Sequence, residues 1–184
     1  MIKLLIKFLK RLLPLKYRVK VGKNFTSNGR VLLIDNGKVL IGDNVRINSS
    51  TRSNPVYGVG KTILVCQYNA HLIIGNDVGI SNAQIYCEKE ITIGDRTLIG
   101  AGVKMWDLDF HSIKIIDRKK SDDRGVSKPI SIGSDCFIGA GSIITKGVVL
   151  GDGTVIGAGS VVTKSTGVNE LWAGNPAKFV RYID

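Results

Sequence analysis

The segment 105-MWDLDFHSIKII-116 contains the side chains of this chain that are best suited to acid–base chemistry. Its His111 is one of two histidines and follows Asp107 and Asp109. A neutral imidazole is the usual general base near pH 7, and a neighbouring carboxylate can orient it. A lone histidine is more often structural than catalytic, but the long loop that begins here favours a catalytic role. The second histidine, His71, precedes a regular apolar position and is expected to be an ordinary strand residue.

Aliphatic residues that recur every six positions define the framework around this segment. A period of six fits neither an amphipathic helix nor a two-sided strand. It is typical of a solenoid in which each hexapeptide sends one side chain inward. Three hexapeptides close one triangular coil, so Ile132 should stack on Leu150, and Ile138 on Ile156. The clearest run of such positions is Ile132, Ile138, Ile144, Leu150, Ile156 and Val162.

The same period continues toward the N-terminus with less regularity. The spacing slips by one residue between Ile80 and Ile93, which predicts a small bulge near Ile85. After Met105 the next regular position comes 27 residues later instead of six, so about 21 residues leave the coil. Loops of this length in a compact domain are usually functional or disordered. We therefore expect one solenoid domain over residues 24–184, with a protruding active-site loop at 107–129.

Residues 1–23 differ in character, because they carry eight Lys or Arg and no acidic residue. Basic and apolar residues fall on opposite faces of a helical wheel, and Pro14 should end or kink the helix. Two interpretations are compatible. The favoured one is a helix that caps the open end of the solenoid. The other is peripheral contact of residues 1–20 with an anionic membrane surface.

The composition narrows the class of protein. The net charge is +11, but the basic residues are not interleaved with stacking aromatics, so we expect no nucleic-acid partner. No apolar stretch of about 18 residues could form a spanning helix. The start lacks the features of a signal peptide, which predicts a cytoplasmic protein. The three cysteines form no CxxC pair, so reduced, buried thiols are expected, without a disulfide or a metal role.

Three parts of the chain together resemble the hexapeptide-repeat acyltransferases. They are the run IGAGSIITKGVVLGDGTVIGAGSVVTKS, the segment DLDFH, and 171-LWAGNPAKFVR-181. The branch that residues 38–183 resemble is that of the sugar O-acetyltransferases, such as galactoside, maltose and surface-polysaccharide acetyltransferases. The resemblance implies an all-β fold, a left-handed parallel β-helix. The left-handedness comes from the resemblance, since periodicity cannot show it.

For the acceptor site, the resemblance implies a mechanism without an acyl-enzyme. His111 would take the proton from an acceptor hydroxyl as that hydroxyl attacks the thioester of acetyl-CoA, with backbone amides stabilising the oxyanion. Asp109, or less favourably Asp107, would orient the imidazole. Ser81, or Asn82 beside it, would position the acceptor where relatives often place Asn. The remaining residues assigned to acceptor binding are Trp106, as a wall of the pocket, and Asp107.

For the co-substrate, the resemblance implies a groove between neighbouring β-helices, and hence a homotrimer. Small residues at coil corners would contact the pantetheine arm of acetyl-CoA, although corner geometry alone explains them. Other residues would meet the distal pantetheine and the nucleotide, with basic side chains near the phosphates. No metal is implied. The expected residues are Gly139, Ala140, Gly157, Ala158, Thr163, Lys164, Lys178 and Arg181.

These observations favour an acetyl-CoA-dependent O-acetyltransferase of a saccharide. The pathways we consider for its acceptor are capsule, O-antigen or exopolysaccharide synthesis at the inner membrane face. Two alternatives stay open. One is an N-acetyltransferase acting on an amino-sugar nucleotide, and the other is a β-helix that serves as a scaffold without catalysis. A β-helical carbonic anhydrase would need three histidines around zinc, and this chain has two.

Overall fold

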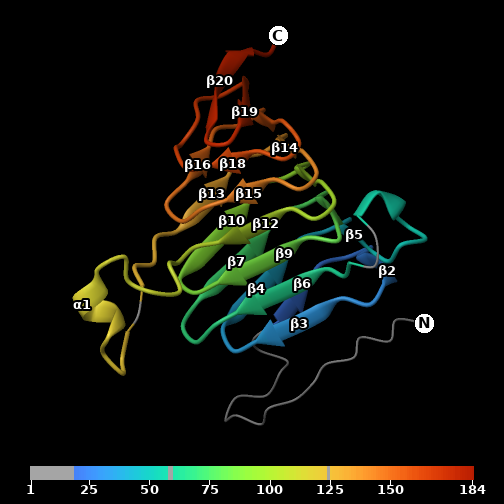
Figure 1. Ribbon diagram of the computed structural model, residues 1–184. Helices are drawn as coiled ribbons and strands as arrows, with labels where there is room; N and C mark the ends of the chain where they lie inside the picture. Colours follow the sequence, from blue (N-terminus) through green and yellow to red (C-terminus); the bar gives the residue numbers. More distant parts are fainter. Residues whose placement is uncertain (1–18, 58–59, 124) are drawn as a thin grey trace.

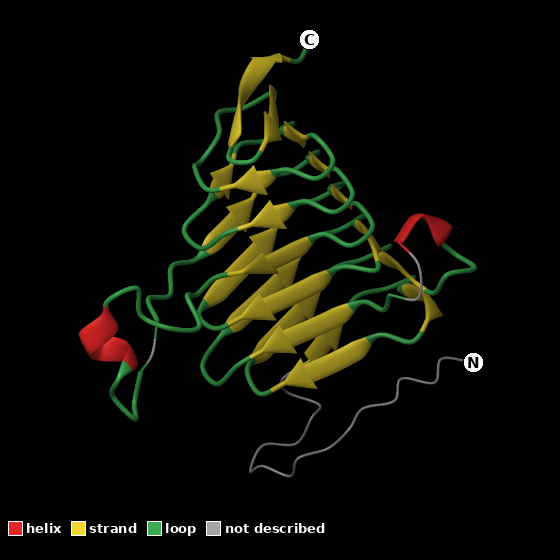
Figure 2. Ribbon diagram, viewed as in Figure 1, coloured by secondary structure: helices red, strands yellow, loops and turns green. Residues whose placement is uncertain are grey.

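The computed structural model describes residues 19–57, 60–123 and 125–184, which form three sheets wound into a triangular solenoid (Figures 1 and 2). Sheet A contains β1 (Val19–Val21), β4 (Lys38–Ile41), β7 (His71–Ile74), β10 (Glu90–Ile93), β13 (Ile130–Ile132) and β16 (Val149–Leu150). Sheet B contains β2 (Thr26–Gly29), β5 (Arg46–Ser49), β8 (Gly79–Ser81), β11 (Leu98–Ile99), β14 (Phe137–Ile138), β17 (Val155–Ile156), β19 (Glu170–Gly174) and β20 (Ala177–Tyr182). Sheet C contains β3 (Leu32–Asp35), β6 (Ile63–Cys66), β9 (Gln84–Cys87), β12 (Lys104–Trp106), β15 (Ile143–Ile144) and β18 (Val161–Val162).

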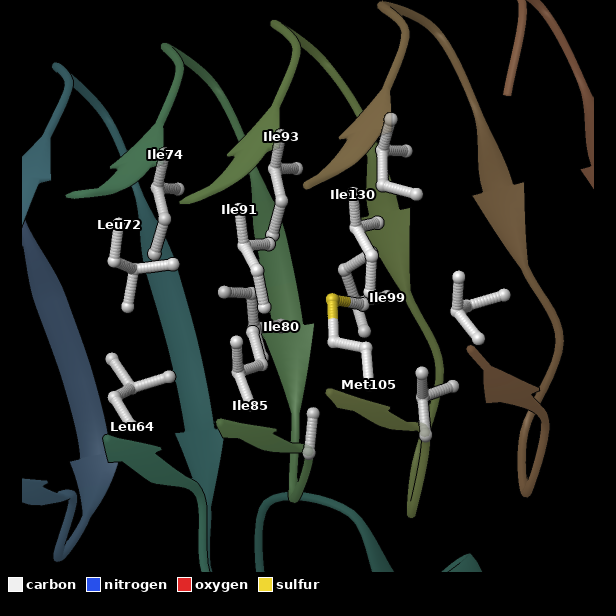
Figure 3. Close-up of a cluster of buried hydrophobic side chains, with 14 of the residues drawn as sticks. Leu64, Leu72, Ile74, Ile80, Ile85, Ile91, Ile93, Ile99, Met105 and Ile130 are labelled. Carbon is white, nitrogen blue, oxygen red and sulfur yellow. The ribbon is translucent and has the colours of Figure 1, made fainter. Parts of the chain in front are cut away.

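Successive coils stack in the register that the six-residue period predicts. Ile132 pairs with Leu150, and Ile138 pairs with Ile156, in parallel strands. All six positions of the clearest run are at most 2% exposed, because each lies on the inner face of a sheet. The earlier coils continue the same interior column (Figure 3). The predicted fold, a left-handed parallel β-helix, is therefore confirmed.

Residues in the left-handed backbone region turn corners between the strands of a coil, and many of these residues are not glycine. Gly141 and Gly159 adopt φ values of 72° and 71° at equivalent corners. At other corners this conformation belongs to residues with side chains, such as Asn44, Asp77 and Arg96, with φ near 60°. Asn and Asp tolerate this region better than most residues because they form local hydrogen bonds. Asn44 Nδ2, for example, donates to Asp77 Oδ1 of the next coil at 2.9 Å.

The slip in period near Ile85 does not produce a bulge within a strand, so this prediction was wrong. β9 pairs residue for residue with β6 and with β12. The irregularity lies instead at the two corners that flank β9. Asn82 turns the first corner with φ 44°, and residues 88–89 form the second corner. An inserted residue destabilises the fold less at a corner than within a strand, because a corner makes few of the hydrogen bonds between neighbouring strands.

Two edges of the prism carry the insertions. The edge between sheets B and C, called here the BC edge, carries residues 50–62 in the second coil, with the 3₁₀ turn η2 (Pro55–Tyr57). The edge between sheets C and A, the CA edge, carries the excursion between β12 and β13. The excursion leaves after Trp106 and returns at Ile130 as predicted, and it contains the single-turn helix α1 (Ile115–Arg118). Figure 1 shows these two insertions projecting on opposite sides.

The predicted N-terminal helix lies, for residues 1–18, outside the described residues. The last part of the segment assigned to it is strand instead, because Val19–Val21 pairs with Val39–Ile41 as the first strand of sheet A. The β-helix therefore begins before residue 24. In the described part of the chain, no helix is long and apolar enough to cross a membrane. The cysteines Cys66, Cys87 and Cys136 are free and buried, as predicted.

Candidate active site

His111 occupies an open position at the root of the excursion, on the CA edge. Its side chain is 75% exposed, and its Nδ1 lies 2.9 Å from Oδ2 of Asp123. The Asp123 side chain is only 8% exposed, and its Oδ1 accepts the backbone N–H of Ser112 at 3.0 Å. The Ser112 N–H and the His111 contact lower the pKa of the Asp123 carboxyl. This carboxylate is consequently ionised at neutral pH.

An ionised Asp123 determines which imidazole nitrogen of His111 carries the proton. A carboxylate can only accept a hydrogen bond, so Nδ1 of His111 must donate. In the neutral ring Nε2 then carries the lone pair and is the atom able to accept a proton. This arrangement of a base oriented by a buried carboxylate is the one that general-base catalysis requires.

The orienting residue expected from the sequence, Asp109, lies elsewhere. Its Oδ1 accepts from Nζ of Lys146 at 2.7 Å, and its backbone N–H donates to the carbonyl of Val126. A side chain on Gly125 would collide with the Asp109 backbone oxygen, so the two arms of the excursion are tightly joined. Asp109 therefore ties the excursion to the next coil, and Asp123 replaces it as the partner of His111.

Asp107 is a structural residue in this fold, which corrects its assignment to acceptor binding. It is 0% exposed. Its carboxylate oxygens accept the backbone N–H groups of Glu88, Lys89 and Glu90 at 2.6, 2.7 and 2.7 Å. Three convergent N–H groups leave the carboxylate no free face toward solvent. Asp107 thus holds the corner at residues 88–89 of the preceding coil, and it cannot contact an acceptor in this conformation.

Trp106, predicted to form a wall of the acceptor pocket, lies on the outer face of sheet C beside the excursion. It lines an apolar cavity of about 260 Å³ with Tyr86 and Phe110. The Tyr86 and Phe110 rings meet edge to face with their centroids 5.1 Å apart. The cavity contains few polar atoms, so Trp106 and its neighbours could pack against an apolar group.

The structure distinguishes the two candidates for positioning the acceptor. Ser81 ends β8 on the outer face of sheet B, is half-buried, and lines an open groove. Asn82 is 0% exposed, and its Nδ2 lies 3.5 Å from the carbonyl of Asn54 in the loop 50–62. Its buried Oδ1 has no hydrogen-bond partner among the described residues. Ser81 is therefore accessible from solvent, and Asn82 is not.

Several residues expected to bind CoA form one strip with Ser81 along the BC edge. Ile80, Ile99, Ile138 and Ile156 are in register, so the residues that follow them stack as Ser81, Gly100, Gly139 and Gly157. The row continues through Ala173, which pairs with Lys178. At the usual strand spacing, the five steps from β8 to β20 span roughly 24 Å.

Packing alone requires glycine within this strip. A Cβ on Gly139 would lie 2.5 Å from the Ala158 nitrogen and 2.7 Å from the Ile156 oxygen. Gly139 is itself buried, whereas Ala140 is half-buried and Ala158 is exposed. The alanines at the corner are thus the members that present side chains outward. At the C-terminal end Lys178 and Arg181 are exposed on β20, where an anionic group could reach them.

The other two residues expected to bind CoA lie on the opposite edge. Thr163 and Lys164 follow β18 at the CA edge, two coils beyond Trp106, and both are exposed. The predicted residues therefore fall into two groups. The BC group contains Ser81, Asn82, Gly139, Ala140, Gly157, Ala158, Lys178 and Arg181. The CA group contains Trp106, Asp107, Asp109, His111, Thr163 and Lys164.

The width of sheet C separates these two groups within one chain. Its strands contain up to four residues, or roughly 13 Å at 3.3 Å per residue, and the corners add to this. His111 and Ser81 therefore do not meet within one chain, since Ser81 ends β8 on sheet B and His111 lies in the excursion after β12. The described residues also contain no cluster of three or more His, Cys, Asp or Glu side chains that could hold a metal.

Comparison with known proteins agrees with this architecture. Residues 129–164 match the model of the hexapeptide repeat of succinyl-transferase. This part of the chain therefore contains a hexapeptide repeat. A Dictyostelium discoideum relative assigned as an acetyltransferase is 41% identical over 117 residues, covering 63% of this chain and 59% of the relative. Galactoside O-acetyltransferase of Escherichia coli is 36% identical over 88 residues, covering 46% of this chain and 42% of the enzyme. The chain thus spans less than two thirds of either relative.

Solved structures extend the similarity over more of the chain. The polysialic acid O-acetyltransferase OatWY aligns over 89% of the chain and 74% of its own length, with a TM-score of 0.69 and 26% identity. A Vibrio cholerae hexapeptide-repeat acetyltransferase, crystallised with acetyl-CoA, aligns over 65% of the chain and 64% of its own length, with a TM-score of 0.57 and 29% identity.

Sequence reasoning missed Asp123, and the reason is physical. From sequence alone, any of the five aspartates of the excursion could reach His111. They are Asp107, Asp109, Asp117, Asp122 and Asp123. No periodicity applies there, so spacing cannot select among the carboxylates. The selection depends on how the excursion folds back, through the antiparallel bridge between Leu108 and Ser127.

Proposed function

We propose that this protein is an acetyl-CoA-dependent O-acetyltransferase whose acceptor is a saccharide. The observation that carries the proposal is the His111–Asp123 pair, an accessible imidazole oriented by an ionised carboxylate. The similarity to O-acetyltransferases with galactoside and polysialic acid acceptors supports the reaction class. The relative crystallised with acetyl-CoA supports the acyl donor.

In the proposed reaction, Nε2 of His111 accepts the proton of an acceptor hydroxyl. The oxygen attacks the thioester carbonyl, the carbon–sulfur bond breaks, and the proton passes from the imidazolium to the departing thiolate. Asp123 holds Nδ1–H throughout and stabilises the transient positive charge on the ring. No covalent acyl-enzyme is needed, because His111 acts on the acceptor and not on the acetyl group.

We further propose that each active site lies between two copies of the chain in a homotrimer. Within one chain His111 lies on the CA edge, and Ser81 and the strip toward Lys178 lie on the BC edge. A cyclic assembly that places the CA edge of one copy against the BC edge of the next would unite the two groups. Thr163 and Lys164 on the CA edge would then face the same groove as the alanines on the BC edge.

The cellular role that fits this reaction is modification of a capsule, O-antigen or exopolysaccharide unit at the cytoplasmic face of the inner membrane. The basic residues within 1–20 would hold the protein near an anionic lipid surface. Deleting residues 2–20 should then abolish cosedimentation with vesicles containing anionic lipid. Unchanged cosedimentation would remove the membrane role and leave a cap as the function of this segment.

Thiol release from acetyl-CoA tests the reaction directly. Wild type, His111→Ala and His71→Ala are compared with a panel of free, nucleotide-linked and lipid-linked sugars. Loss of a general base should lower acceptor-dependent release by roughly 10²–10⁴-fold in His111→Ala. His71→Ala is the matched control, because His71 lies on β7 and its nearest carboxylate, Glu90 Oε2, is 3.9 Å away. Equal transfer by wild type and His111→Ala would refute the mechanism, and no release with any acceptor would favour the scaffold.

A further inference from the structure

The groove that Ser81 lines on the outer face of sheet B contains features that the proposed reaction does not use. Its volume is about 550 Å³, and it extends across β5, β8, β11 and β14. Two rows of outward positions form its surface. One row holds Arg46, Gly79, Leu98 and Phe137, and the other holds Asn48, Ser81 and Gly100.

The hollow exists because position 79 has no side chain. In the same row the neighbouring coils carry Arg46, Leu98 and Phe137, each of which is exposed. A Cβ on Gly79 would lie 2.9 Å from Leu98 Cδ2, so the leucine already leans over the gap. A ring placed over Gly79 would have Arg46 on one side and the apolar surface of Leu98 on the other.

Arg46 is the available cation of this face. Arg96, on the adjoining corner, is already occupied, because its Nε and Nη2 bind the two oxygens of Asp135, each at 2.7 Å. The Arg46 backbone N–H donates to the Val78 carbonyl, but its guanidinium group makes no hydrogen bond or ion pair within the described parts of the chain. A guanidinium group matches a carboxylate with two parallel hydrogen bonds.

Polar groups beside Arg46 suit the hydroxyls of a sugar. Asn48 Oδ1 accepts from Asn28 Nδ2 at 2.9 Å, which leaves the Asn48 amide hydrogens for a ligand. Ser81 lies next to Asn48 in register. One carboxylate, that of Asp77, also lines the groove, but its Oδ1 already accepts from Asn44. The groove therefore holds one positive side chain, Arg46, and one negative side chain, Asp77, and of the two it is Asp77 that already has a side-chain partner.

We propose that this groove is the acceptor subsite and that it selects a saccharide bearing a carboxylate. Arg46 binds the carboxylate, Asn48 and Ser81 bind hydroxyls, and the ring lies over Gly79 once the flexible end of Leu98 turns aside. This inference rests on the proposed function, since it assigns the acceptor of the same reaction. The groove adjoins the strip toward Gly139 and Gly157, so a hydroxyl bound near Ser81 lies at the start of the proposed acetyl-CoA path.

A pair of probes that differ only in the carboxylate tests the inference. Methyl glucuronide and methyl glucoside are titrated into the full-length protein, and binding is followed by nuclear magnetic resonance. Wild type should bind the glucuronide roughly 10-fold or more tightly than the glucoside, because hydrogen bonds to charged groups are stronger than those between neutral groups. Arg46→Gln should remove this preference while the weak binding of the glucoside stays unchanged. Lys38→Gln, which removes the same charge from exposed sheet A, should keep the preference.

A second variant tests the shape of the groove. Gly79→Val should weaken binding of both glycosides, because the new side chain would fill the space over position 79. The variant should still fold, since the flexible end of Leu98 can move aside, and circular dichroism checks this. Equal affinity for the two probes in wild type, a preference that survives Arg46→Gln, or no saturable binding at millimolar concentration would each overturn the inference. Acetyl transfer to neutral sugars alone would refute the inference and leave the proposed function intact. Selective binding of the glucuronide without any transfer would refute the proposed function instead.

Discussion

Asp123 and His111 form a pair in which the carboxylate is buried and the imidazole is exposed, with 2.9 Å between Oδ2 and Nδ1. The carboxylate can therefore orient the ring without competing with a substrate for its open side. Asp123 has a second anchor in the N–H of Ser112, so it remains in place when the ring moves. Nδ1 of His111 is thus held by Asp123, and Nε2 is free to accept a proton.

Replacing Asp123 by asparagine should lower kcat by roughly 10- to 100-fold with little change in KM. An amide at this position can donate to Nδ1 and so favours the tautomer with the proton on Nε2, which cannot act as a base. Steady-state thiol-release assays would measure this. Asp122→Asn is the matched control, because it removes the same charge from an exposed neighbour. Equal losses in the two variants would indicate a general charge effect and not an orienting role.

The contact between Asp123 and His111 should also persist in mildly acidic solution, because the pKa of the Asp123 carboxyl is lowered. The pKa of Asp123 is lowered, first by the Ser112 N–H and then by His111. A lowered carboxyl pKa contributes stability above the unfolded value of about 3.9, and this contribution is lost as pH falls through the folded value. A ¹³C titration of the Asp123 carboxyl should therefore have its midpoint below 3.9. His111→Ala should raise this midpoint partway, since the Ser112 N–H remains. A midpoint unaffected by His111→Ala would contradict the pairing.

Asp107 and Asp109 should differ sharply in their effect on stability. Asp107→Asn should reduce the free energy of unfolding by about 1.5–3 kcal/mol, because a neutral amide cannot accept from three convergent N–H groups. Asp109→Asn should cost less than about 1 kcal/mol, since its pair with Lys146 is partly solvated. Thermal and denaturant unfolding would compare the two variants. Similar losses would mean that the corner at residues 88–90 does not depend on Asp107.

The buried thiols should react only when the β-helix opens. Cys66, Cys87 and Cys136 are at most 1% exposed. Burial raises the pKa of the Cys136 thiol, and the hydrogen bond with Cys66 together with burial raises the pKa of Cys87. These effects suppress the reactive thiolate of Cys87 and Cys136, whereas the pKa of Cys66 is lowered by its hydrogen bond with Cys87, so burial alone protects Cys66. Reaction with a thiol reagent at pH 8 should therefore proceed at the rate of local or global unfolding. A thiol titrated within the mixing time would contradict this packing.

A site shared between copies should allow two inactive variants to rescue each other. His111→Ala removes the base on the CA edge, and Ser81→Trp blocks the groove on the BC edge. In a cyclic trimer refolded from an equal mixture, about a quarter of the interfaces would combine an intact His111 with an intact Ser81. Activity should recover to about that fraction. No recovery would place both groups of one site within a single chain.

The sequence predicts the framework of this fold far better than the details of the site. The six-residue period identifies Ile132 and Leu150 as stacked partners, since a solenoid repeats one packing unit. It cannot identify Asp123, because no repeat governs the excursion. The period also shows that the spacing of apolar residues slips near Ile85. It cannot show whether the extra residue lies in a corner or in a strand bulge, since either one adds a residue. Ser81 and His111 were both singled out, but their separation on two edges became visible only when the strands were assigned to sheets.

The hairpin of β19 and β20 gives the molecule two unlike ends. Sheet B runs in parallel through β17 and β19, but β20 pairs antiparallel to β19 and carries exposed Lys178 and Arg181. Another coil arriving from a second molecule would meet a strand of the wrong direction and a row of positive charge. Charged and reversed edge strands are known protection against edge-to-edge association. The hairpin thus interrupts coil-on-coil stacking along sheet B, whereas sheets A and C end in the parallel strands β16 and β18.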